Sequence, residues 1–164
     1  MEMVKMADQH VAELNIARLK HDINDPRIAD FVNNLDRVNA AAERSDGFIW
    51  RLELDATATD VVVMNDPHII ANMSVWRDID SLERFVFQTI HKRIYARKAE
   101  WFDAMDKMHF VMWPVSVGHE PDLNEALARL EMLNTQGASD EAFGWDYAKS
   151  SGLWRTELCD SSAA

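Results

Sequence analysis

The chain has 164 residues, about the length of one ordinary domain, and 48% of them are hydrophobic against 27% charged. It carries 28 acidic and 17 basic side chains, and the formal charge of −11 argues against binding to nucleic acid or an anionic membrane, because phosphate binding needs clustered Lys and Arg. No apolar run approaches the ~20 residues that span a bilayer, and the N-terminus shows no signal-like apolar stretch. The single cysteine, Cys159, excludes an internal disulfide and a cysteine-based zinc site. We therefore expect a soluble, acidic, cytoplasmic protein.

The first part of the chain predicts a strand, a helix and a second strand. Residues 10–19 alternate loosely between apolar and polar side chains, as in a half-buried strand. Asp25-Pro26 predicts a helix start, and apolar residues at three- and four-residue steps continue to about Arg44, before Gly47 ends the helix. Residues 48–54 alternate again, which predicts a strand with Phe48, Trp50 and Leu52 on one face.

The middle of the chain predicts a third strand and an irregular helix. Residues 61–64 are either a short strand or part of a loop, whereas residues 69–76 form a main strand with Asn72, Ser74 and Trp76 on one face. Asp80 and Glu83 resemble a capping box that opens a helix. Its apolar stripe changes sides along its length, so the helix either bends near His91 or gives way there to a second helix, and we favour the break.

The last part predicts one more strand and one more helix. Residues 109–117 alternate, and Pro114 cannot donate to a ladder, so this strand lies at an edge or is bulged there. Asp122 opens a further helix and Gly137 ends it. We assign residues 1–137 to one domain with this C-terminal helix, and residues 138–164 to an extension that docks in part through Trp145, Tyr147 and Trp154.

This order of elements predicts an α+β fold of the ferredoxin-like βαββαβ type, with an antiparallel sheet and an extra C-terminal helix. Such a sheet carries helices on one face, so its other face needs a cover. The same sheet of a second chain would supply that cover in a two-fold homodimer.

Two sets of residues carry a resemblance to known families. The passage Ser74-Val75-Trp76-Arg77-Asp78, followed by Leu82, Phe85 and His91, resembles the dimeric α/β-barrel superfamily of small monooxygenases and haem-degrading enzymes. A closer resemblance, from about Val11 to Phe143, is to the bacterial domain of unknown function 3291. The segments that carry it are Leu14–Arg18, Glu43–Arg51, Glu100-Trp101-Phe102 and Gly118-His119-Glu120-Pro121.

The superfamily resemblance implies a pocket between helices and sheet. His91 matches a histidine that ligates haem iron in the haem-degrading members, and Asn15 lies near the place of an asparagine on their first strand. Phe85 stands where those members have a tryptophan, a departure from the haem-degrading pattern. A neutral imidazole can serve as iron ligand or base, and the alternative for His91 is a residue that caps a helix end.

The function predicted from these residues is a small oxidoreductase of monooxygenase type that acts on a hydrophobic aromatic or polyketide-like molecule, either with haem on His91 or without a cofactor. The alternatives are a non-catalytic small-molecule or haem-binding protein and a non-redox cyclase or isomerase. His91 and Asn15 are the candidate catalytic residues. Large flat side chains and strand amides suit an aromatic ligand, and the candidate substrate-binding residues are Trp50, Asn72, Ser74, Trp76, Phe85, Trp101, Trp113 and His119.

Overall fold

An antiparallel sheet forms the centre of the molecule. The computed structural model describes residues 9–53, 63–105 and 107–151. The main strands are β1 (Gln9–Leu19), β2 (Phe48–Arg51), β3 (Ile69–Trp76) and β5 (Phe110–Ser116), and they lie in the order β2-β3-β1-β5. The two-residue strand β4 (Phe102–Asp103) pairs with the end of β1. This order and the antiparallel pairing are those of the ferredoxin-like fold, so the predicted fold class is confirmed.

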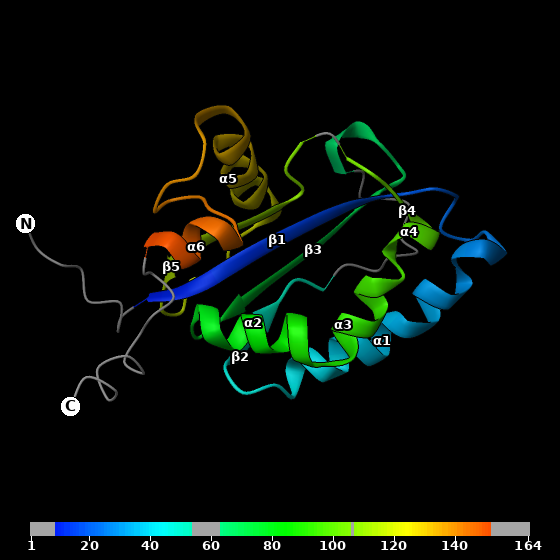
Figure 1. The fold of residues 1–164 in the computed structure, drawn as a ribbon, viewed down its shortest axis with the longest axis horizontal. Helices are drawn as coiled ribbons and strands as arrows, with labels where there is room; N and C mark the ends of the chain where they lie inside the picture. The colour runs from blue at the N-terminus through cyan, green and yellow to red at the C-terminus, as the bar shows by residue number, and fades with distance from the viewer. Residues whose placement is uncertain (1–8, 54–62, 106, 152–164) are drawn as a thin grey trace, which may run out of the picture.

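Helices lie on both sides of the sheet (Figure 1). One side carries α1 (Ala29–Glu43), α2 (Ile79–Gln88), α3 (Ile90–Ala96) and α4 (Lys98–Trp101), and we call this the helix-layer side. The short helix α6 (Trp145–Ser151) packs into the same apolar cluster as α2. The other side carries α5 (Leu123–Gln136).

Side-chain caps explain where the helices begin. Asp25 accepts a hydrogen bond from the backbone of Arg27 before the 3-10 turn Pro26–Ile28 that leads into α1, and Asp122 caps α5 in the same way through Glu125. The cap of α2 is Asp78, which accepts from the backbone N–H of Ser81 at 2.8 Å. The prediction that Asp80 caps this helix was therefore wrong by two residues.

The predicted break in the middle helix is confirmed. Thr89 has extended backbone angles, ends α2, and caps α3 by accepting from the backbone N–H of His91 at 3.2 Å. His91 lies in the first turn of α3, and its ring bonds the carbonyl oxygen of Val86 in the last turn of α2. The alternative interpretation of His91 as a residue that caps a helix end therefore agrees with the structure.

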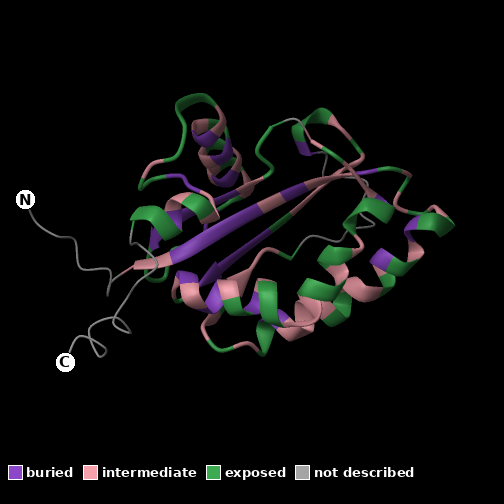
Figure 2. Ribbon diagram, in the orientation of Figure 1, coloured by how far each residue is buried: buried purple, intermediate pink, exposed green. Residues whose placement is uncertain are grey.

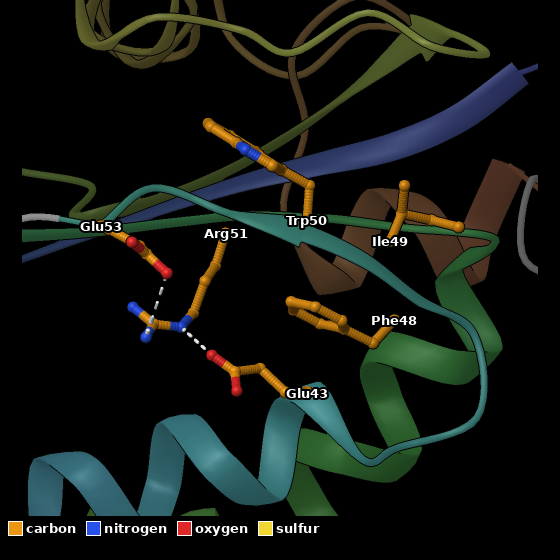
Figure 3. A pocket seen from close by; sticks show the side chains of 6 residues that line it. All are labelled: Glu43, Phe48, Ile49, Trp50, Arg51 and Glu53. Atoms are coloured by element: carbon orange, nitrogen blue, oxygen red, sulfur yellow. Dashed lines mark hydrogen bonds and ion pairs between the residues drawn. The ribbon is translucent and has the colours of Figure 1, made fainter.

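Strand β2 does not alternate as predicted. Its pairing with β3 shifts register between Phe48 and Trp50, which places Phe48 opposite Trp76 and Trp50 opposite Val75. The bulge therefore directs Phe48 to the helix-layer side and Trp50 to the α5 side, and Figure 3 shows the two rings on opposite sides of the strand. The expectation that both rings share one face was wrong.

The core is divided between the two sides of the sheet, and Figure 2 shows the buried residues concentrated on β1, β3 and the inner faces of the helices. On the α5 side, Leu130 and Leu133 of α5 pack against Leu14 and Trp113. This helix thus covers part of the face for which we had expected a second chain. The homodimer itself stays a prediction.

Some predictions fall outside the described residues: Val61 and Val62, Trp154 and Cys159. Within the described ranges, no helix has the length and apolar content that a bilayer crossing requires.

Candidate functional site

A row of polar side chains crosses the middle of the sheet on the helix-layer side. Glu13 of β1 lies opposite Ser74 of β3, and two residues further along Asn15 lies opposite Asn72. Because strand side chains alternate, all four belong to the same face. We call these four residues the polar strip.

Apolar clusters flank the polar strip at both ends. At one end Trp76, Leu82 and Phe85 pack with residues of β1, β5 and α6. At the other end Leu19 and Trp101 pack with the start of α1. The polar strip thus lies between the two apolar clusters of the helix-layer side.

Glu13 is the residue of this strip with the most unusual environment. Its side chain is 5% exposed, and burial raises its pKa from an ordinary value of 4.5 to about 8, despite the opposing effect of hydrogen bonds from the side chain and backbone of Ser74. The Ser74 hydroxyl donates to Glu13 Oε1 at 2.6 Å and accepts from Trp76 Nε1–H at 2.9 Å. The carboxyl group is therefore held in one position and titrates close to neutral pH.

The polar strip becomes open to solvent next to this buried carboxyl group. Asn15 is half-buried, whereas Asn72 is exposed at a point where β3 pairs with β1 and lies beyond its last pair with β2, Arg51 with Ser74. An exposed residue on the inner face of this strand means that the helices do not cover the sheet at this point. Asn15 and Asn72 are therefore the members of the polar strip that solvent reaches, two residues along the strands from Glu13.

His91 is connected to this region through aromatic rings. Trp76 stacks on Phe85 with centroids 5.2 Å apart, and Phe85 lies 5.3 Å from the imidazole, which stacks on its other side against Tyr95. His91 Nδ1–H donates to the carbonyl oxygen of Val86 at 3.1 Å, which leaves the lone pair on Nε2. Burial lowers the pKa of His91, so the ring is neutral at pH 7.

Two surface hollows are formed by described residues. One runs along β2, has a volume of about 360 Å³, and is lined by Glu43, Phe48, Ile49, Trp50, Arg51 and Glu53 (Figure 3). Its only cation, Arg51, is held by Glu43 at 2.7 Å, which argues against an anion site there. The other, of about 640 Å³, lies between α1 and the junction of α2 and α3.

Neither of the two hollows above lies at His91, so they offer no site for a haem group on this residue. An iron ligand needs a hollow in front of Nε2 that holds the macrocycle, and His91 lines neither of the two hollows. The Phe85 and Tyr95 rings also occupy the space over its faces. We derive no step through haem. Within the described ranges, no group of three or more His, Cys, Asp or Glu side chains is arranged to hold a metal ion.

The remaining candidate residues lie away from the polar strip. Trp50 and Trp113 are on the α5 side, and Trp113 Nε1–H donates to Glu125 Oε2 at 3.0 Å. His119 Nε2 bonds the other oxygen of Glu125 at 2.8 Å, so it belongs to the same region. Trp101 packs at the start of α1. The four predicted tryptophans therefore do not line one pocket, and Trp76 alone contacts the strip.

Glu13 was missed by the sequence analysis, although the sequence holds a signal for it. It stands between Val11 and Asn15 on a strand that the ferredoxin-like order makes central. A carboxyl group on a central strand is a candidate for burial, which would raise its pKa, but the sequence does not show which residues of the strand the helices cover.

Comparisons with solved structures give neighbours of low sequence identity. A conserved protein from Methanosarcina mazei Go1 is 14% identical with a TM-score of 0.49, and the match covers 68% of this chain and 95% of that one. SnoaB, a cofactor-independent oxygenase from Streptomyces nogalater, is 17% identical with a TM-score of 0.45, over 70% of this chain and 97% of that one. None of the curated proteins compared with the chain matches it.

The comparison with protein families is more decisive. The sequence model of the domain of unknown function DUF3291 matches residues 10–158, which include every helix described above and every strand residue except Gln9. The resemblance noted from the segments around Asn15, Gly47 and His119 is thereby confirmed. The chain belongs to the DUF3291 family.

Proposed function

We propose that this protein is an enzyme that acts on a small hydrophobic aromatic or polyketide-like molecule at the polar strip. The observation that carries the proposal is the buried Glu13 carboxyl group, with a pKa of about 8, beside the open amides of Asn15 and Asn72. A proton-transferring group works best when its pKa lies near the working pH, and burial provides that here.

The reaction that we propose is of monooxygenase type. The Glu13 carboxylate removes a proton from an acidic C–H of the substrate, and the amides of Asn15 and Asn72 donate hydrogen bonds to the enolate oxygen that forms. The carbanion transfers electrons to O2, and a C–OOH bond forms. Loss of water from this hydroperoxide leaves a ketone, so one CH2 and one O2 give one C=O and one H2O, with the proton returned from Glu13.

The surrounding residues position this group. Ser74 and Trp76 hold the carboxyl oxygen through their hydrogen bonds, and Phe85 supports the Trp76 ring from the helix layer. His91 supports Phe85 in turn. These residues keep the carboxyl group in place while its protonation changes, which we regard as a positioning role.

The test uses anthrone, a tricyclic aromatic ketone with an acidic methylene, and measures oxygen uptake and anthraquinone formation. We expect one O2 consumed per anthrone, and a Glu13→Gln variant to lower kcat about 100-fold or more, because the amide cannot accept the proton. The rate should rise with pH through a transition near 8, and this transition should be lost in the variant. The matched control is Glu131→Gln, which removes an exposed carboxylate from α5.

Three results would overturn the proposal. Equal turnover by Glu13→Gln and the natural chain would remove Glu13 from the reaction. Conversion of the probe without oxygen would indicate a non-redox cyclase or isomerase. Saturable binding in air with no turnover would indicate a carrier.

A further inference from the structure

The hollow between α1 and the α2–α3 junction is rich in positive charge. Three cations line it, Arg37 from α1 and Lys92 and Arg93 from α3, together with Phe87, Thr89 and Ile90. Its volume is about 640 Å³, and it is open to solvent rather than enclosed. We call it the cationic hollow.

These cations differ from most arginines of the chain in that no described carboxylate lies within ion-pair distance of them. Six arginines elsewhere in the described residues have such a carboxylate, whereas Arg44 and Arg129 do not. The six are Arg18, Arg27, Arg51, Arg77, Arg84 and Arg97. For the three cations of the hollow, the polar side-chain contact found within the described ranges is that of Arg37 Nη1 with Asn34 Oδ1 at 3.4 Å. A chain with 28 acidic side chains thus leaves three positive charges gathered at one hollow without a carboxylate among the described residues.

The local backbone explains why these charges meet. Thr89 Oγ1 donates to the carbonyl oxygen of Phe85 at 2.5 Å and accepts from the backbone N–H of His91 at 3.2 Å, which fixes the angle between α2 and α3. Lys92 and Arg93 follow in the first turn of α3. Because α3 packs against α1, they come to lie beside Arg37.

The hollow also has an apolar wall. Phe87 is 41% exposed although it packs against Trp145, with ring centroids 5.4 Å apart, and Ile90 lies beside it at the start of α3. A ligand that satisfies the whole hollow therefore carries negative charge at one end and an apolar body at the other.

We propose that the cationic hollow binds a phosphate ester of an aromatic or aliphatic molecule. A phosphate ester carries nearly two negative charges and three acceptor oxygens at pH 7, which matches two guanidinium forks and one ammonium group better than a carboxylate does. The hollow shares no residue with the polar strip. This inference therefore stands apart from the proposed reaction.

The test is calorimetric titration with 1-naphthyl phosphate on the full chain. We expect saturable binding with Kd of about 1 mM or tighter at low salt, weakened by added NaCl because the contacts are ionic. A variant with Arg37→Gln, Lys92→Gln and Arg93→Gln should bind at least about tenfold more weakly, since it loses every charge-assisted contact. The matched control is Lys20→Gln, Arg44→Gln and Lys107→Gln, which removes three exposed cations elsewhere and should bind as the natural chain does.

Titrations with three related compounds separate the contribution of the phosphate group from that of the apolar ring. Inorganic phosphate should bind more weakly than 1-naphthyl phosphate, and 1-naphthol should not bind, if charge and apolar body both contribute. The absence of saturable binding, or equal binding by the triple variant, would overturn the proposal. So would 1-naphthoate binding as tightly as the phosphate, because the hollow would then select carboxylates. Anthrone turnover by the triple variant reports separately on the polar strip, so the two proposals can fail independently.

Discussion

A carboxyl group at 5% exposure, in the middle of a sheet, is unstable as an anion unless a cation accompanies it. Glu13 has instead a hydroxyl donor, Ser74, and an indole behind it, so its neutral form is favoured. Its neighbours Asn15 and Asn72 were predicted from the sequence, because amides on apolar strands stand out. Glu13 was not, because an alternating strand shows which residues share a face and not whether that face is covered.

We expect Glu13 to make the stability of the protein depend on pH. Its folded pKa of about 8 lies above its unfolded value of 4.5, so the folded state holds a proton that the unfolded state releases. The contribution of Glu13 to the free energy of unfolding should be highest below pH 4.5. It should fall as the pH rises from 4.5 to about 8. Each pKa unit by which the folded and unfolded states differ corresponds to about 1.4 kcal/mol. The stability lost between these two pH values therefore amounts to a few kcal/mol.

Urea unfolding at pH 5, 6.5 and 8 tests this expectation. The Glu13→Gln variant keeps an acceptor for Ser74 and does not ionise, so its stability should fall less over this range than that of the natural chain. If the free energies of unfolding of the two proteins changed with pH in parallel, the pKa of Glu13 would not be raised by folding.

At the scale of elements, the sequence predicted the ends of helices well, but it did not predict the register in which two strands pair. The start of α5 at Asp122, its end at Gly137 and the break at Thr89 depend on residues within one turn, so the sequence predicts them or comes within two residues. The bulge in β2 depends on how Phe48 and Trp50 pair with β3, 25 or more residues away. A period of two in the sequence cannot reveal such a shift.

The turn after α1 gives an element-scale prediction. Gly47 has φ +88°, and a Cβ there would overlap Oγ and Cβ of Ser81, which is buried in the first turn of α2. Gly47→Ala should therefore destabilise the protein by about 2–5 kcal/mol, from backbone strain and overpacking together.

The matched control is Gly118→Ala. Gly118 has nearly the same φ, +89°, with nothing within 4 Å of an added Cβ, so this variant carries the backbone strain alone. Thermal unfolding of the two variants isolates the packing contribution. If both lose the same stability, the close approach of Gly47 to α2 does not matter.

At the scale of the whole molecule, α5 changes how the sheet is covered. It contacts β5 and β1, so this part of the face expected to meet a second chain is already occupied. The part formed by β2 and β3 retains partly buried apolar residues, which are Trp50, Leu52, Ile69 and Ala71. We propose that a second copy packs there, since two-fold contacts commonly cover such apolar faces.

Light scattering tests this proposal. We expect a mass of twice the 18.8 kDa chain, and a Trp50→Glu variant that keeps its circular dichroism but has the mass of one chain. The control is Val117→Glu, which adds the same charge at an exposed position just beyond the end of β5. A natural chain that elutes with the mass of one copy rules the homodimer out.

The sequence by itself determined the order of the main elements, the caps at Asp25 and Asp122 and the ferredoxin-like topology, because helix periodicity, strand alternation and capping act over a few neighbouring residues. It also determined the family, through the segments that resemble it. Only the tertiary structure decided which side chains share an environment. It separated Trp50 and Trp113 from Trp76, and brought Arg37 beside Arg93. It also buried Glu13, because the burial of one strand residue depends on every element that packs above and below it.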